Sequence, residues 1–373
     1  LNKVNENIQG KMDFGGAELS WFGGQSIRNF VLKDSDEQTI AAFDRLDTEA
    51  SLWRLIRGDL DFGRTTLSGL KGFIESTSDG ETNLERALRS RKRKDQDREG
   101  KIPDSLRIHF FMPDATIRYQ TPSVEPAILR DFDAEVDFPG TGAPIAFELK
   151  GQTEQGTLEG NLEASGKIID LISRADKLTP DRARFDVQAA AKNLPVVGLE
   201  AFAGHSGMLT SALGPQLDLI VKTETKGAEG TAEVSMQSQN LSAEMFLLKQ
   251  NKLLTLQKPS TINLTITPEF AEFLSSRMSA ERSIQIDKPA PVQVSLETLR
   301  LPLLREELSM LAMQGVMQTG EWRFSGDETI DGVAVQDLKA TVSTARLGSI
   351  VNVDLTGSIE KDGTANPFTT TAE

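Results

Sequence analysis

Apolar and polar residues alternate along most of the chain, which is the pattern of β-strands with one apolar face. Because successive side chains of a strand point to opposite sides of a sheet, alternation gathers the apolar residues on one face. Turn-forming Gly, Pro and Asp-Gly positions separate these runs. The clearest runs contain Ile108, Phe110 and Met112, then Ile262, Leu264 and Ile266, and finally Val292 and Val294.

Only a few segments have the spacing of a helix. Helices are predicted near residues 167–175, 195–213 and 269–280, where apolar residues recur at intervals of three and four. A helix starting at Asn83 is also predicted, with this residue as its N-terminal cap. A further short helix is predicted after Ser51, with a buried stripe made of Leu52, Trp53, Leu55 and Ile56.

These elements predict an α+β protein that is predominantly antiparallel β. An elongated sheet with short helices packed on or capping one face is expected. Residues 1–88 are predicted to form a β module with short helices, and residues 105–373 to continue the β-rich region with the three helices above. Residues 89–104 are predicted to be a charged linker. A basic patch for phospholipid headgroups is the alternative, but acidic residues interleave with the basic ones, so a solvated linker is favoured.

Residues 10–88 hold several pieces whose order resembles the C-terminal region of the AsmA-like family of bacterial envelope proteins. The resemblance covers about 80 of the 373 residues. The matching pieces are a strand end with Leu19, Trp21, Phe22 and Gly23, a short helix with Leu52 and Leu55, a strand pair from Leu67 to Ile74, and a turn at Gly80 ahead of Asn83 and Leu84.

The resemblance implies a fold, an elongated curved sheet of the repeating β-groove type, and a function. AsmA-like proteins are thought to form long curved sheets with an apolar concave face that carries phospholipid between membranes. It implies phospholipid or another acyl lipid as the partner, a periplasmic location in the cell envelope, and a parent chain anchored in the inner membrane. The lining would include the alternating residues named above, Ile108 to Met112, Ile262 to Ile266, Val292 and Val294. For any single one of these residues, packing under a short helix as ordinary core is the favoured alternative.

Composition narrows the classes of partner and compartment. The net charge is −14, which argues against nucleic acid and anionic membrane surfaces as main partners because both are bound through basic surfaces. The chain has no Cys, which excludes disulfides, thiol nucleophiles and thiolate zinc sites. It begins at Leu1 in the middle of a pattern, without a signal peptide and without an apolar run long enough to span a membrane. A fragment or an excised domain is therefore expected, and the resemblance implies that the parent chain carries an N-terminal membrane anchor.

No segment has a strong catalytic signature, so no enzyme activity and no cofactor or metal are expected. Gly204 to Met208 approximate the G-x-S-x-G pattern of a nucleophile elbow, but Met208 replaces the last Gly. His109 and His205 have no companion at metal-binding spacing. Asp34 and Asp36 begin like a calcium loop that lacks its Gly and its closing Glu.

Paired carboxylates occur twice at strand spacing, in Asp59 with Asp61 and in Asp131 with Asp133. Such pairs can serve acid–base catalysis, but on strands they usually form the solvated face.

Two functional hypotheses are favoured: a lipid-binding envelope protein with an apolar β groove, and a periplasmic scaffold whose sheet is fully covered and has no lipid site. A carbohydrate-active enzyme is the weakest class, because the chain has only three Trp and one Tyr.

Overall fold

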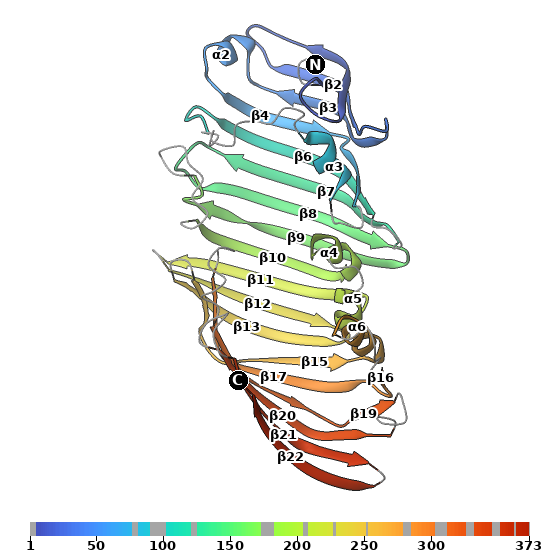
Figure 1. The fold of residues 1–373 in the computed structure, drawn as a ribbon. Coiled ribbons are helices and arrows are strands. Elements are labelled where there is room, and N and C mark those ends of the chain that lie inside the picture. The colour runs from blue at the N-terminus through green and yellow to red at the C-terminus, as the bar shows by residue number, and fades with distance from the viewer. Residues whose placement is uncertain are drawn as a thin grey trace. The chain divides into compact units, whose positions relative to one another are not determined.

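The computed structural model describes residues 5–76, 81–89, 102–120, 125–172, 183–203, 208–226, 229–250, 253–278, 285–302, 312–325, 332–344, 351–361 and 363–372. The chain divides into two compact units, Leu1–Gly204 and His205–Glu373. Each unit is built around β-sheet with short helices (Figure 1). The prediction of an α+β fold dominated by antiparallel sheet is confirmed.

Unit 1 contains three described helices, α2 (Leu52–Ile56), α3 (Asn83–Leu88) and α4 (Val196–Ala203). Its strands are β1 (Lys11–Glu18), β2 (Gln25–Lys33), β3 (Thr39–Thr48), β4 (Asp61–Ser68), β5 (Lys71–Glu75), β6 (Arg107–Gln120), β7 (Ala127–Phe138), β8 (Ile145–Gln155), β9 (Leu158–Ile169) and β10 (Arg184–Pro195).

The strands of unit 1 pair mostly in antiparallel fashion, and this pattern is broken where β4 and β5 pair with β6. Both β4 and β5 pair with β3 on one side and with β6 on the other, and their pairing with β6 is parallel. The other described pairs, from β1–β2 to β9–β10, are antiparallel. Strands before and after the charged segment 89–104 therefore belong to one sheet. Residues 90–101 of the predicted linker lie outside the described residues.

Unit 2 contains α5 (Met208–Leu213) and α6 (Pro268–Met278) among its described residues. Its strands are β11 (Gln216–Lys226), β12 (Glu229–Ser238), β13 (Leu241–Gln250), β14 (Leu253–Leu256), β15 (Ser260–Ile266), β16 (Gln285–Ile286), β17 (Ala290–Pro302), β18 (Ala312–Thr319), β19 (Trp322–Ser325), β20 (Ala334–Thr344), β21 (Val351–Lys361) and β22 (Thr364–Ala372). The described strand pairs of this unit are antiparallel, and β14 and β15 share the position between β13 and β17.

The predicted helices had different outcomes. The segment 195–213 contains α4 and α5, and 269–280 contains most of α6, whose cap Thr267 accepts a hydrogen bond from Phe270 N at 3.2 Å. The helix near 167–175 is wrong, because β9 extends to Ile169 and pairs with β10. That pairing overrides the helix-like spacing of the apolar residues; residues 173–175 lie outside the described part.

The cap of α3 is Thr82 rather than Asn83. The Thr82 hydroxyl accepts from Glu85 N, and the Glu85 carboxylate accepts from Thr82 N, which is a capping box. Asn83 is buried and bonds β5 instead: its side chain accepts from Glu75 N at 3.0 Å and donates to Phe73 O at 2.9 Å. It therefore fixes α3 to the sheet. None of the described helices has the length and apolar character that a membrane crossing requires.

Candidate functional site

One face of unit 1 is apolar across β6, β7, β8, β9 and β10. The register shows this directly, because cross-strand partners point to the same side of a sheet. One row of partners crosses the five strands through Met112, Ala134, Leu149, Ala164 and Ala189. The next row crosses them through Phe110, Val136, Phe147, Gly166 and Val187.

Alternation extends these two rows along the strands, and none of the resulting side chains is charged. We call this surface the apolar face of unit 1. Its members are Ile108, Phe110, Met112, Ala115, Ile117, Leu129, Phe132, Ala134, Val136, Phe138, Ile145, Phe147, Leu149, Leu162, Ala164, Ile168, Phe185, Val187, Ala189 and Ala191.

Bulges keep this face apolar where the strands bend. The register of β6 and β7 shifts between Met112 and Ala115, where Asp114 has a left-handed φ of 55°. Its N–H donates to the Asp133 carboxylate at 2.9 Å. The extra residue lets Met112 and Ala115 point to the same side, so the apolar surface continues through the bend.

The opposite face of the same strands is charged. His109 Nε2 lies 3.1 Å from a Glu135 oxygen, and Lys150 Nζ lies 2.5 Å from a Glu148 oxygen. These groups are exposed enough for water to screen them, so each pair contributes little to stability. The strands thus present a charged face to water on one side and an uncharged apolar face on the other.

The apolar face of unit 1 has no second layer at its centre among the described residues. Met112, Ala115 and Ala134 form a buried cluster, and the residues packed around it, Leu67, Leu70, Phe110, Phe132 and Leu149, all belong to strands or to the link between β4 and β5. Most other members of the face are only half-buried, and Phe185 remains 39% exposed. The side chains of the apolar face of unit 1 are shielded from water mainly by one another.

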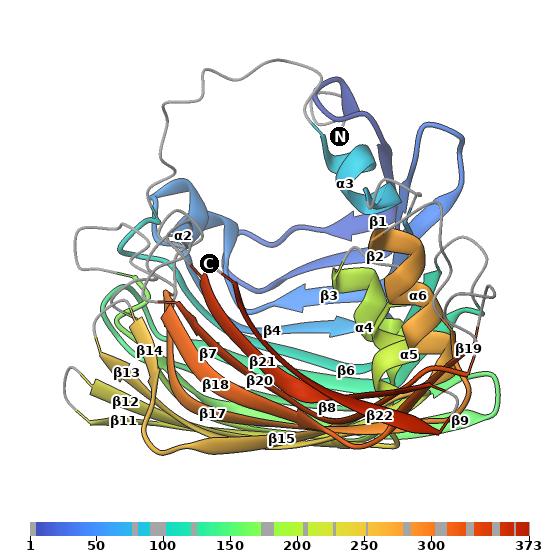
Figure 2. The same cartoon turned by 60° about the horizontal axis from the view of Figure 1, so that its bottom comes forward.

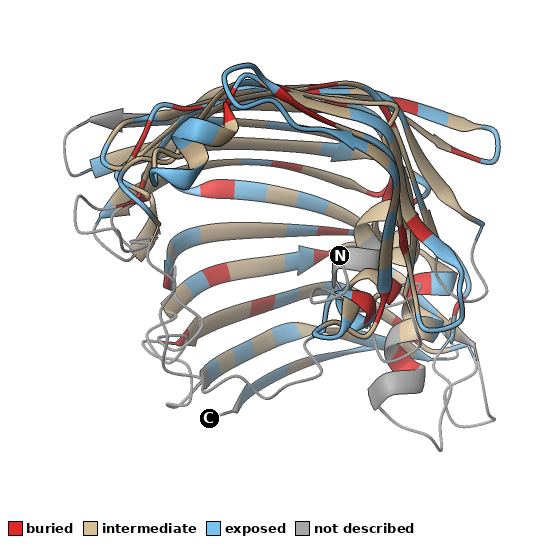
Figure 3. Ribbon diagram, turned by 90° about the horizontal axis from the view of Figure 1, so that it is seen from above, coloured by how far each residue is buried: buried red, intermediate tan, exposed pale blue. Residues whose placement is uncertain are grey.

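This face is the concave one. The strands of unit 1 bend along their length, and α4 lies on the inner side of the bend (Figure 2). A Cβ atom at Gly198 of α4 would contact the Cβ atom of Ala127, 3.8 Å away. Ala127 is the cross-strand partner of Tyr119, on the same side as Ile117. Figure 3 shows the strands coloured mostly tan and pale blue, half-buried and exposed, with short buried segments among them.

The predicted groove residues lie in two different places, three of them in unit 1 and five in unit 2. Ile108, Phe110 and Met112 lie on the apolar face of unit 1. Ile262, Leu264, Ile266, Val292 and Val294 also share one face, because β15 pairs with β17 in the register Ile262 with Val294 and Leu264 with Val292.

In unit 2 that face is covered at its centre. Ile266 and Val292 are buried with Phe270 of α6, and Ala212 of α5 packs against the same cluster. Leu264 and Val294 are partly buried at its margin. Ile266 and Val292 therefore pack as core with residues of α5 and α6, which is the alternative that the sequence left open.

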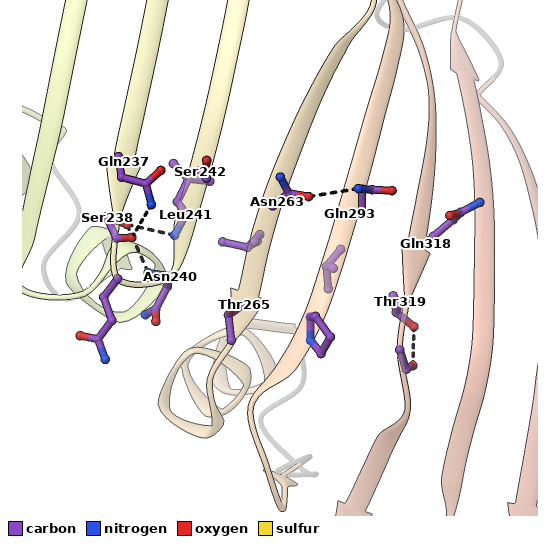
Figure 4. Close-up of a pocket in the computed structure, with 15 residues that line it drawn as sticks. Gln237, Ser238, Asn240, Leu241, Ser242, Asn263, Thr265, Gln293, Gln318 and Thr319 are labelled. Carbon is purple, nitrogen blue, oxygen red and sulfur yellow. Dashed lines mark hydrogen bonds between the residues drawn. The ribbon is translucent and has the colours of Figure 1, made fainter.

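The polar face of unit 2 carries a shallow pocket of 460 Å³ (Figure 4). Gln237, Asn263, Gln293 and Gln318 line it, and Gln293 Nε2 donates to Asn263 Oδ1 at 3.2 Å. Ser238 Oγ accepts from Leu241 N at 3.0 Å and so closes the turn between β12 and β13. None of the residues lining this pocket is charged, and its amides bond one another and the turn.

The residues that carry the family resemblance lie at one end of unit 1. Leu19, Trp21, Phe22 and Gly23 form the loop between β1 and β2 and are exposed. Leu52 and Leu55 are half-buried in α2, and Leu84 packs against the cluster of Leu32, Ile40 and Ala87. Gly80 lies outside the described residues.

The buried stripe predicted for α2 is wrong in part. Trp53 and Ile56 are 46% and 66% exposed, and the helix has no buried residue. The helix is only five residues long, and Leu52 and Leu55 are half-buried while Trp53 and Ile56 are exposed. Ser51 caps it as predicted, accepting from Arg54 N at 3.4 Å.

The residues considered as weak catalytic candidates form ion pairs or turn hydrogen bonds where the structure describes them. Arg54 pairs with Asp59 at 2.8 Å and with Asp61 at 3.1 Å, and its guanidinium lowers the pKa of Asp59. Asp34 Oδ1 accepts from Asp36 N at 2.9 Å, which closes a turn. Residues 204–207, including His205, lie outside the described part.

No cluster of three or more His, Asp or Glu side chains suited to a metal ion occurs within the residues that the structure describes. Sequence reasoning missed Phe132, Val136, Phe147 and Leu149 as members of the site, although it placed them in strands. The signal was the same alternation that marked Phe110. Only the register shows that their apolar sides coincide.

Comparisons with protein-family models, with curated proteins and with solved structures find no match for this chain.

Proposed function

We propose that unit 1 binds acyl chains of phospholipid along its concave apolar face and serves lipid handling in the bacterial cell envelope. The observation that carries the proposal is the five-strand apolar face with no charged side chain and, in the described part of the chain, no helix over its centre. Soluble proteins rarely leave a continuous apolar surface of this kind open to water unless it contacts another apolar surface.

An acyl chain suits this face in shape and in chemistry. Removing one methylene group from water stabilises a complex by about 0.8 kcal/mol, so a chain lying across several strands gains a large total. The two rows that cross the five strands, from Met112 to Ala189 and from Phe110 to Val187, offer apolar contact and contain no polar side chain. A charged headgroup would find no partner on the face and would stay at its solvated margin.

The family resemblance at the β1–β2 loop and α2 supports the cellular setting. It favours a periplasmic location, a parent chain anchored in the inner membrane and a part in transport or outer-membrane homeostasis. The proposal involves no catalytic step.

A periplasmic scaffold without a lipid site is the second candidate, and the cluster of Ile266, Val292 and Phe270 in unit 2 favours it. A sheet whose apolar face is closed by its own helices needs no ligand. The two candidates differ in what they predict for unit 1.

Native mass spectrometry after incubation with phospholipid tests the proposal, with organic extraction to identify any lipid that co-purifies. We expect at least one bound phospholipid per chain. A chain that stays lipid-free after purification and after incubation would contradict the proposal and favour the scaffold.

Two adjacent residues of β6 provide a matched pair of variants. Phe110 lies on the apolar face, whereas Phe111 points to the other side, where the Arg64 guanidinium lies 5.6 Å from its ring centre. Phe110→Asp is expected to abolish lipid binding, because it places a charge in the path of the acyl chain. Phe111→Asp should keep it. Equal loss in both variants, or in neither, would count against the face as the site.

A further inference from the structure

Most of the exposed large apolar side chains in the described part of unit 1 lie in the β1–β2 loop and in α2. Leu19, Trp21 and Phe22 in the β1–β2 loop are 63%, 56% and 86% exposed, and Trp53 and Ile56 of α2 lie on the adjoining helix. Two backbone hydrogen bonds join loop and helix, from Leu52 N to Ser20 O and from Trp53 N to Trp21 O, both at 3.1 Å (Figure 1). We call these five side chains the aromatic tip.

The loop that presents the aromatic tip is held by a buried glutamine. Gln25 is only 8% exposed, and its side chain accepts from Ser20 N and donates to Ser20 O, Gly23 O and Ala50 O at 2.8–3.0 Å. Both the oxygen and the nitrogen of this amide are therefore used to fix the loop. The exposure of the rings is thus built into the fold, and the ordering of the loop is complete before any partner arrives.

The charge around the aromatic tip is balanced. Arg54 is neutralised by Asp59 and Asp61, and the Arg57 guanidinium lies 4.9 Å from the ring centre of Trp53. A polyanionic partner would need free basic groups, and an apolar protein pocket would not need an arginine beside the indole. Trp rings flanked by Arg are the composition that settles at the boundary between lipid headgroups and acyl chains.

We propose that the aromatic tip inserts into the interface of a phospholipid bilayer and docks unit 1 on a membrane surface. The aromatic tip is also connected to the apolar face of unit 1. The loop and α2 connect β1 with β2 and β3 with β4, and Leu67 of β4 packs against the cluster at Met112. Docking would bring the apolar face of unit 1 to the bilayer from which it draws acyl chains. In this respect the inference rests on the proposed function.

Flotation with vesicles of phosphatidylethanolamine and phosphatidylcholine tests the docking. The full chain carries Trp322→Phe, so that its fluorescence comes only from Trp21 and Trp53. We expect the protein to float with the vesicles and its emission to shift to shorter wavelength. The double variant Trp21→Ser with Phe22→Ser should lower the partition coefficient by about tenfold or more, because two rings leave the apolar contact.

A matched control removes exposed apolar side chains elsewhere. Ile220→Ser with Ile359→Ser, two residues of unit 2 that are 44% and 40% exposed, should leave flotation unchanged. Protein that stays unbound, or tip variants that float like the parent, would overturn the proposal. A blue shift that grows with protein concentration in the absence of vesicles would overturn it in favour of a second copy as the partner.

Docking and lipid uptake can fail separately. The tip variant should still bind monomeric short-chain phosphatidylcholine by native mass spectrometry, and Phe110→Asp should still float. Loss of short-chain lipid binding in the tip variant would contradict a purely docking role. Failure of the unaltered chain to bind any lipid, with flotation intact, would overturn the proposed function and leave the aromatic tip as a membrane anchor.

Discussion

In unit 1 the cluster around Met112 is made of strand residues and their link, whereas in unit 2 the cluster around Ile266 and Val292 is closed by Phe270 of α6. Both sheets have an apolar face and a polar face, built by the same alternation. Their polar faces differ locally: the polar face of unit 1 carries ionic groups such as Glu135 and Lys150, and the pocket on the polar face of unit 2 is lined by Gln and Asn side chains.

The comparison shows that alternation alone does not decide what an apolar face is for. A helix that packs on the face removes it from water and turns it into core, and the gain appears as stability. Without the helix, the same surface keeps its cost of exposure until another apolar group covers it. In unit 2 the helix α6 has removed the cluster at Ile266 and Val292 from water on folding, whereas on the apolar face of unit 1 most side chains remain half-buried.

The largest expected difference between the two units is in how far the removal of a phenyl ring lowers the free energy of unfolding. Phe270→Ala should lower the free energy of unfolding by about 3–5 kcal/mol, since the ring is buried and its loss leaves a cavity. Phe110→Ala should cost about 1 kcal/mol, because its ring is only half-buried. Urea unfolding followed by circular dichroism, with unit-specific hydrogen exchange, measures both. Equal costs would remove the distinction between covered and open faces.

Lipid should stabilise one unit and leave the other unchanged. At a lipid concentration about 100 times Kd, binding to the folded state adds about 2.7 kcal/mol of stability to the unit that binds. Hydrogen exchange should therefore slow in β6 to β10 and stay constant in β15 and β17. Phe110→Asp serves as the control and should lose the effect. Slower exchange confined to β15 and β17 would assign the site to unit 2.

Much of the sheet could be predicted from the sequence, because alternation reports which residues of one strand share a face. Phe110 in unit 1 gave the same signal as Leu264 and Val292 in unit 2, yet the cluster of the second set includes Phe270 of α6, whereas the described cluster at Phe110 consists of strand residues and the β4–β5 link. Coverage depends on where a helix lies in space, and periodicity does not contain that information.

The same limit explains the errors in the helices. Ile168 and Ile169 have helix-like neighbours, but pairing with Phe185 and Arg184 places them in β9. Trp53 has the spacing of a buried stripe, but α2 is too short to bury both of its sides. Local pattern was sufficient only where no long-range pairing competed with it.

Removing the N-terminal cap of a covering helix should lower the free energy of unfolding by a smaller amount. Thr82 caps α3, which packs on the cluster of Leu32 and Ile40 in unit 1, and Thr267 caps α6 in unit 2. Thr82→Ala and Thr267→Ala should each cost about 1 kcal/mol. Hydrogen exchange should place the loss of protection in β1 to β3 for the first variant and in β15 to β17 for the second. Matching patterns in both variants would mean that the helices do not cover their clusters independently.

The smallest expected effect is a dependence on pH through the first turns of these two helices. The pKa of Glu85 is lowered from 4.5 because Thr82 N–H and the Thr82 hydroxyl donate to its carboxylate, and the pKa of Glu269 is lowered by its own N–H and by the Thr267 hydroxyl. A carboxyl whose pKa is lower in the folded state stabilises the protein above its unfolded pKa, and this contribution is lost as the pH falls through the folded value. Between about pH 6 and pH 3 the urea midpoint should therefore fall less in Glu85→Gln with Glu269→Gln than in the unaltered chain. Glu163→Gln, on a strand of unit 1, is the control that caps no helix, and an equal change there would assign the pH dependence to general charge rather than to the helix starts.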